Sequence, residues 1–77
     1  MKPEQVRMAR AALQIGVREL GEMAGVSFTT ISRFETGKNG LQHSTAEAIR
    51  AALEARGIQF LESGQISAGP GIVLKGE

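Results

Sequence analysis

The sequence of 77 residues predicts a mainly helical fold, with four helices followed by a C-terminal pair of β-strands. Up to Gly57, apolar residues recur three or four positions apart between capping residues, which is typical of amphipathic helices. After Gly57 the pattern changes to short apolar runs separated by a stretch rich in Gly, Ser and Pro, which is typical of strands. We therefore divide the chain into a helical domain, residues 1–57, and a strand segment, residues 58–77.

The first helix is predicted over Pro3 to about Leu13, because proline suits the first helical position. Its buried stripe consists of Val6, Ala9 and Leu13. A short connection follows and ends at Gly16, which can cap a second helix over Val17 to Ala24.

A third helix is predicted over Phe28 to Glu35. Gly25 stands where the second helix must end, since glycine adopts a left-handed backbone without strain. Ser27 can cap the third helix by accepting a hydrogen bond from the N–H of Thr29 or Thr30. Gly21 has no Cβ, so it permits close approach of the third helix. The apolar residues that can then share one core are Leu20, Ala24, Val26, Ile31 and Phe34.

Residues 36–40 contain two glycines and an asparagine, so we expect a loop, which Leu41 anchors to the core. Ser44 and Glu47 match a capping box, which predicts that the fourth helix starts there, and Gly57 ends it. The apolar face of this helix consists of Ile49, Ala52 and Leu53. The two strands are predicted over Ile58–Leu61 and Ile72–Leu74.

The pattern of the second and third helices is similar to that of a known family. The residues Leu20, Gly21, Ala24, Gly25, Val26, Ser27, Ile31, Phe34, Glu35 and Gly37 resemble the lambda-repressor-like, Xre-type helix-turn-helix family of phage and bacterial regulators. The match extends back to residues 5–10 and forward through residues 46–57. The resemblance implies a DNA-binding transcription regulator. Larger members of the family commonly close with a fifth helix, so the strand pair departs from their pattern.

If the third helix enters the major groove, the base contacts come from the side chains that face away from the core. They are Phe28, Thr29, Ser32 and Arg33. Arg33 is the first choice as a reader, because arginine can donate two hydrogen bonds to one guanine, and Thr29 offers a hydroxyl and a methyl group. Phe28 either contacts a thymine methyl or folds back over the turn near Val26.

By resemblance, the DNA backbone is held around the start of the second helix and by the loop after the third. The residues assigned to it are Arg10, Gly16, Val17, Arg18, Ser27, Lys38 and Asn39. Free N–H groups and the helix dipole make a helix N-terminus suitable for phosphate. Val17 stands where many members have a glutamine, which removes one polar contact. Arg10 and Glu35 match the internal ion pair of the family, which ties the first helix to the end of the third.

We expect a homodimeric repressor that binds double-stranded DNA at a near-palindromic operator and excludes polymerase. The strand residues assigned to dimerisation are Ile58, Phe60, Leu61, Ile72, Val73 and Leu74, which pack on the helices and pair with a second copy. The alternative for the strands is a hairpin folded back on its own domain. The alternative for the function is the antitoxin of a toxin–antitoxin pair, whose C-terminal segment adds strands to the toxin.

The composition excludes several other classes of protein. The net charge of +1 would not by itself suggest nucleic-acid binding. The chain has no Cys and no Asp, and its only histidine is His43, so we expect neither an enzyme nor a metal site nor a cofactor. Gly64, Gly69 and Gly71 lack the Gly-Lys-Ser or Gly-Lys-Thr and the following helix of a phosphate-binding loop. No apolar run approaches the roughly 20 residues of a membrane span, and no signal peptide opens the chain, so we expect a soluble cytoplasmic protein.

Overall fold

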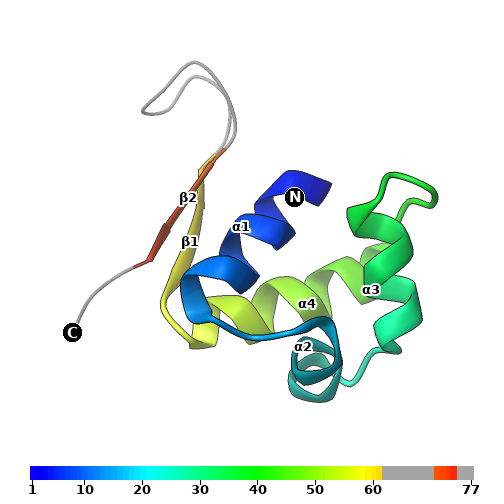
Figure 1. Cartoon of the computed structure of the whole chain (residues 1–77), viewed down its shortest axis with the longest axis horizontal. Helices are drawn as coiled ribbons and strands as arrows, with labels where there is room; N and C mark the ends of the chain where they lie inside the picture. Colours follow the sequence, from blue (N-terminus) through cyan, green and yellow to red (C-terminus); the bar gives the residue numbers. More distant parts are fainter. Residues whose placement is uncertain (62–70, 75–77) are drawn as a thin grey trace.

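The computed structural model describes residues 1–61 and 71–74, which form four helices and two strands (Figure 1). The helices are α1 (Pro3–Leu13), α2 (Val17–Ala24), α3 (Phe28–Glu35) and α4 (His43–Ala55). The strands β1 (Ile58–Leu61) and β2 (Gly71–Leu74) form an antiparallel two-stranded sheet. The predicted mainly helical fold with a C-terminal strand pair is therefore confirmed.

One hydrophobic core joins the helices and the strands. In Figure 1, α1 lies between the strand pair and α3, and α4 runs across the molecule from the side of α3 toward the strands. The buried side chains of this core are Val6, Ala9, Ile15, Leu20, Ile31, Phe34, Ile49, Leu53, Ile58 and Phe60. Leu13, Ala24, Val26, Leu41 and Ala52 are partly buried against it. The core residues predicted for the helices therefore do pack together.

The boundaries of α1, α2 and α3 are those predicted, and their caps explain why. Pro3 is the first residue of α1, and Gly16 is the N-cap of α2. The Oγ of Ser27 accepts a hydrogen bond from the N–H of Thr29 at 3.2 Å, which caps α3. Gly25 ends α2 with a φ of 69°, the left-handed conformation expected of it.

The start of α4 differs from the prediction. The capping box predicted at Ser44 and Glu47 is wrong, because α4 begins at His43 and Ser44 lies inside its first turn. Gln42 is the N-cap residue, and its side chain makes no capping hydrogen bond. The carbonyl of Gln42 accepts from the N–H of Ala46 at 2.9 Å, which closes the first turn. Backbone bonding therefore starts this helix ahead of the Ser-x-x-Glu pattern.

Gln5 is a fully buried polar residue that the sequence pattern did not single out. Its Nε2 donates a hydrogen bond to the carbonyl of Leu61 at 2.9 Å, and its Oε1 accepts from the N–H of Lys2 at 2.7 Å. A buried amide is tolerated when its polar atoms are bonded in this way. Gln5 thereby ties the start of α1 to the end of β1.

The two strands pair within one chain. The register places Ile58 opposite Leu74, Gln59 opposite Val73, Phe60 opposite Ile72 and Leu61 opposite Gly71. Ile58, Phe60 and Leu61 are buried within their own chain, as their expected packing on the helices requires, and their part in a dimer stays a prediction. Val73 and Leu74 stay 38% and 43% exposed. Of the strand residues assigned to dimerisation, these two leave the most apolar surface open to a second chain.

Gly21 is a point of close approach between α2 and the turn that leads into α3. Its carbonyl accepts from the N–H of Val26 at 2.9 Å. A Cβ at Gly21 would lie 2.6 Å from the carbonyl oxygen of Val26 and 3.4 Å from the backbone nitrogen of Phe28. The distance of 2.6 Å between a Cβ and the Val26 carbonyl oxygen is shorter than the contacts that Cβ atoms make in proteins, so the backbone would have to shift. The prediction that a side chain is excluded here is confirmed, although the obstacle is the turn as well as the helix beyond it.

Gly21→Ala is therefore expected to destabilise the protein. Overpacking of this kind costs about 1–3 kcal/mol, whereas alanine gains roughly 1 kcal/mol over glycine inside a helix. The free energy of unfolding in urea should fall for Gly21→Ala. It should stay nearly constant for the control Gly40→Ala, whose Cβ would meet nothing within 4 Å. A Gly21→Ala protein as stable as the original would contradict the close approach.

Candidate nucleic-acid interface

α3 packs one face on the core and leaves the opposite face in solvent. Ile31 and Phe34 are buried. The residues predicted as base contacts, Phe28, Thr29, Ser32 and Arg33, are all exposed. Thr29 and Arg33 are four positions apart, so they lie on one face of the helix. α3 thus displays small hydroxyl side chains and one guanidinium group on a surface that is supported from behind.

Arg33 is the cation on the exposed face of α3. Within residues 1–61 and 71–74, no hydrogen bond or ion pair engages its guanidinium group. A long side chain without an internal partner can adapt to an external acceptor. Arg33 is therefore available for the contact that the sequence predicts.

The predicted ion pair between Arg10 and Glu35 is present, and it ties α1 to the end of α3. The Nε and Nη2 atoms of Arg10 each lie 2.7 Å from a carboxylate oxygen of Glu35. The carboxylate side chain is only 6% exposed. The hydrogen bond to Glu35 is the main cause that raises the pKa of Arg10, and burial opposes it. This is the two-pronged geometry in which arginine binds a carboxylate most strongly.

Arg10 makes one more bond, which limits its expected role at the DNA. Its Nη1 donates to the carbonyl of Ile15 at 3.2 Å, in the connection between α1 and α2. All three guanidinium nitrogens of Arg10 thus donate within the chain. Its observed role is to hold α1, this connection and α3 together, and the phosphate contact assigned to it stays a prediction.

Arg7 adds a second link to α3 that the sequence reasoning missed. Its Nη1 donates a hydrogen bond to the backbone carbonyl of Glu35 at the C-terminal end of α3. A cation at this end of a helix also interacts favourably with the helix dipole. The spacing could have revealed this link, because Arg7 and Arg10 are three positions apart and face the same side of α1.

The start of α2 lies open at one of the two places where phosphate contacts are expected. Gly16 offers no side chain to cap this helix. The first N–H groups of a helix, here those of Val17 and Arg18, have no acceptor within the helix. The side chain of Val17 packs against the core, so this residue can offer only its N–H. The side chain of Arg18 is exposed.

The resemblance also implies phosphate contacts from backbone N–H groups of the loop after α3, and two of these groups are already bonded within the chain. The backbone N–H groups of Lys38 and Asn39 both donate to the carbonyl of Arg33, at 2.9 and 3.4 Å. They close the end of α3, so they are already engaged. Any contact of Lys38 or Asn39 with phosphate falls to their side chains, and both residues are exposed.

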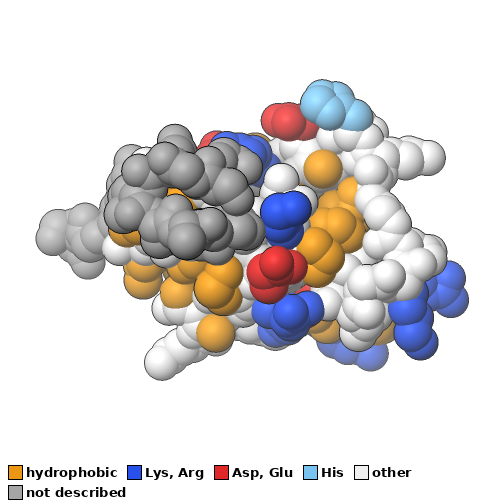
Figure 2. Space-filling view, turned by 90° about the horizontal axis from the view of Figure 1, so that it is seen from above, with side chains coloured by type: hydrophobic (Ala, Val, Ile, Leu, Met, Phe, Trp, Pro, Cys, Tyr) orange, Lys and Arg blue, Asp and Glu red, His pale blue; other side chains and the backbone are white. Residues whose placement is uncertain are grey.

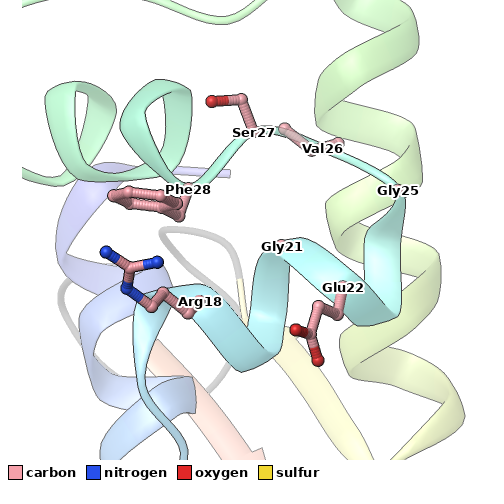
Figure 3. Close-up of a pocket in the computed structure, with 7 residues that line it drawn as sticks. All are labelled: Arg18, Gly21, Glu22, Gly25, Val26, Ser27 and Phe28. Carbon is pink, nitrogen blue, oxygen red and sulfur yellow. The ribbon is translucent and has the colours of Figure 1, made fainter.

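Phe28 contacts the second helix. The guanidinium carbon of Arg18 lies 4.1 Å from the centroid of the Phe28 ring (Figure 3). Both side chains line a pocket of about 290 Å³ between α2 and the start of α3. The ring points toward Arg18 and away from Val26 in Figure 3, so the alternative in which it folds back near Val26 is wrong.

Basic side chains gather on the side of the molecule where α3 lies. Figure 2 shows Lys and Arg side chains at the right-hand edge, which is the side of α3 in Figure 1. Exposed basic residues of α2, α3 and the following loop are Arg18, Arg33 and Lys38. Glu19 and Glu22 of α2 are exposed as well. The positive excess of these elements is therefore small.

Other kinds of site find little support in residues 1–61 and 71–74. No helix there has both the length and the apolar character needed to cross a membrane. No group of three or more His, Cys, Asp or Glu residues in this part of the chain could hold a metal ion. Nothing in these residues points to enzyme activity.

Arg10→Ala is expected to lower the free energy of unfolding by about 3–5 kcal/mol, because it leaves the Glu35 carboxylate buried without its main partner. Glu54→Ala is the matched control. It removes an ion pair with Arg50 at 2.9 Å whose side chains are 35% and 46% exposed. Such exposed pairs contribute about 1 kcal/mol or less. Urea denaturation of both variants measures the difference, and equal losses would contradict the structural role of Arg10.

Comparison with known proteins gave no guide to the site. No protein-family model and no curated protein matches this chain.

Proposed function

We propose that this protein binds double-stranded DNA in a sequence-specific manner, with α3 in the major groove, and acts as a transcriptional repressor of the helix-turn-helix kind. The observation that carries this proposal is the exposed face of α3, where Thr29, Ser32 and Arg33 stand on a helix whose other face is buried. The major groove admits an α-helix, and each base pair presents a distinct pattern of donors and acceptors there.

The chemistry of this face suits the edges of bases. Arg33 donates two hydrogen bonds to O6 and N7 of a guanine, a contact that contributes about 1–3 kcal/mol of discrimination. Thr29 and Ser32 add hydroxyl groups that can donate or accept, and the methyl group of Thr29 can contact thymine. Small side chains beside the arginine let the helix approach the base pairs closely.

Phosphate contacts position the helix but carry no sequence information. In this proposal they come from two places that flank α3. The open N-terminus of α2, with the N–H of Val17, faces one phosphate. The ammonium group of Lys38 binds a phosphate beyond the other end of α3.

The internal links favour recognition because they order α3 before DNA is present. Arg10 and Arg7 both bond to Glu35, the last residue of α3. A recognition helix that is already ordered loses less conformational entropy on binding DNA. More of the free energy of its contacts then contributes to affinity.

Two copies acting together would compensate for the low charge of one. The net charge is only +1, so a single copy neutralises few phosphates. A homodimer on a near-palindromic site places two copies of α3 about one helical turn apart. Each strand of a two-stranded sheet has an edge that can pair with another chain, and β2 carries the exposed Val73 and Leu74. The same edge would suit a strand of a partner protein, such as the toxin of a toxin–antitoxin pair.

Selection of bound duplexes from random DNA tests this proposal. The expected result is a near-palindrome with half-sites about 10 base pairs apart. Arg33→Ala should relax the preference at one base pair in each half-site. Lys38→Ala should weaken binding to all sequences alike and reduce the slope of log affinity against log salt by about 0.9 per copy.

Arg56→Ala serves as the control for these two variants. Arg56 is exposed, lies beyond the C-terminal end of α4 and contacts the sulfur of Met23, so its removal should leave sequence preference unchanged. Failure to enrich any sequence would refute the proposed function. If Arg33→Ala binds more weakly but keeps the same base preference, Arg33 contacts a phosphate and not a base.

Replacing both Val73 and Leu74 by lysine tests the proposed interface. Charges at the edge of β2 should convert a dimer into a monomer, because they oppose pairing of edge strands. Light scattering measures the mass. Met8→Lys, which replaces another exposed apolar residue, is the control and should leave the mass unchanged. Two results for the unmodified protein would refute strand-mediated dimerisation. One is a protein that is monomeric alone but dimeric on its operator, and the other is a protein that binds only a toxin through this edge.

A further inference from the structure

We propose that Phe28 and Arg18 act as one unit, in which the Phe28 ring holds the guanidinium group of Arg18 ready to bind a phosphate of the DNA backbone. The inference rests on the proposed function and adds to it. Phe28 is then a positioning residue that affects DNA binding through Arg18, and it does not read a base.

The contact between the two side chains crosses the turn that joins α2 to α3. Arg18 is the second residue of α2, and Phe28 is the first residue of α3 (Figure 3). Their separation of 4.1 Å is well within the roughly 6 Å at which a cation is attracted to the face of a ring. Phe28 is 38% exposed, so burial in the core does not account for this aromatic residue. Support for Arg18 does account for it.

No carboxylate neutralises Arg18 within the described residues. Glu22 follows it by one helical turn and lines the same pocket, yet no ion pair joins the two. Figure 3 shows the guanidinium group of Arg18 pointing up to the ring and the carboxylate of Glu22 apart from it. An arginine that precedes a glutamate by four positions is also in the less favourable order for a helical ion pair. The charge of Arg18 therefore stays available to an external anion.

Within the described residues, no hydrogen bond uses the guanidinium N–H donors of Arg18. Its central carbon lies over the ring, and the five N–H donors lie in the plane of the group and project from its edges. Arg18 can thus stay on the ring while it donates two parallel hydrogen bonds to a phosphate. A side chain held in this way loses less rotational freedom when the phosphate arrives.

The location favours a phosphate of DNA over a free phosphate ion. Arg18 lies in the first turn of α2, where the N–H of Val17 is open, and it rests on the residue that begins the exposed face of α3. A duplex that places its bases against Thr29 and Arg33 brings its backbone past the start of α3. Arg18 would then bind the phosphate beside the base that Thr29 contacts.

A double-mutant cycle on the selected duplex tests the unit. The variants are Arg18→Gln, Phe28→Leu and the two combined. Arg18→Gln should reduce the salt slope by about 0.9 per copy, as expected for one lost phosphate contact. Phe28→Leu should weaken binding about two- to five-fold with base preference unchanged. The double variant should bind no more weakly than Arg18→Gln, because Phe28 acts only through Arg18.

Phe28→Tyr is the matched control, since it keeps the aromatic face and should retain the affinity. Circular dichroism checks that each variant is folded. In the free protein, the side-chain protons of Arg18 should show an upfield ring-current shift by NMR in the original chain and in Phe28→Tyr, and should lose it in Phe28→Leu. Inorganic phosphate should compete with the duplex only weakly and equally for all variants.

The outcomes separate this inference from the proposed function. Additive effects of the two substitutions, a changed preference at one thymine in Phe28→Leu, or the absence of the ring-current shift would each overturn the unit while leaving DNA binding intact. A strong, Arg18-dependent competition by inorganic phosphate would assign the site to the free ion instead. If the shift is present but the original chain enriches no duplex, the proposed function fails, and the inference fails with it.

Discussion

A carboxylate withdrawn from water needs a cationic partner, and this need at Glu35 determines how α3 is held. The partner comes from another element, because the one cation of α3, Arg33, lies two positions before Glu35, and residues two apart on a helix do not face each other. Arg10 meets the carboxylate with two nitrogens, and Arg7 bonds to the carbonyl of the same residue. α1 therefore supports α3 through polar bonds as well as through the shared apolar core.

The internal and the external roles of the basic residues are clearly divided. Arg7 and Arg10, on α1, are bonded within the chain. Arg33 is exposed on α3, and Arg18 rests on an aromatic ring with its edges free. A low net charge is thus compatible with the proposed function, because a few cations held in useful positions replace a large basic patch.

Much of the fold could be predicted because its signals are local. Pro3, Gly25 and Ser27 each determine a helix boundary through their own backbone or hydroxyl chemistry, and those boundaries were found at the predicted positions. The start of α4 was missed because a Ser-x-x-Glu pattern is only a local preference, and the turn begun by the Gln42 carbonyl prevailed over it.

Contacts between distant residues were harder to foresee. The ion pair of Arg10 with Glu35 was expected only from family resemblance, since spacing alone could not pair residues 25 positions apart. The stack of Arg18 on Phe28 depends on the angle between α2 and α3, and the bond of Gln5 to Leu61 depends on where β1 packs. Neither the angle between α2 and α3 nor the position of β1 is encoded in a short sequence motif. The exposed face of α3, by contrast, followed directly from helical periodicity.

The bond between Gln5 and Leu61 has a consequence for how the protein is made. It joins residues 56 positions apart, so α1 cannot complete its contacts until the chain has been synthesised as far as β1. Contacts between such distant residues form late, because the long loop between them must close first. α1 in turn carries the arginines that hold α3. A growing chain would therefore form α2 and α3 early but acquire their final support only once β1 has left the ribosome.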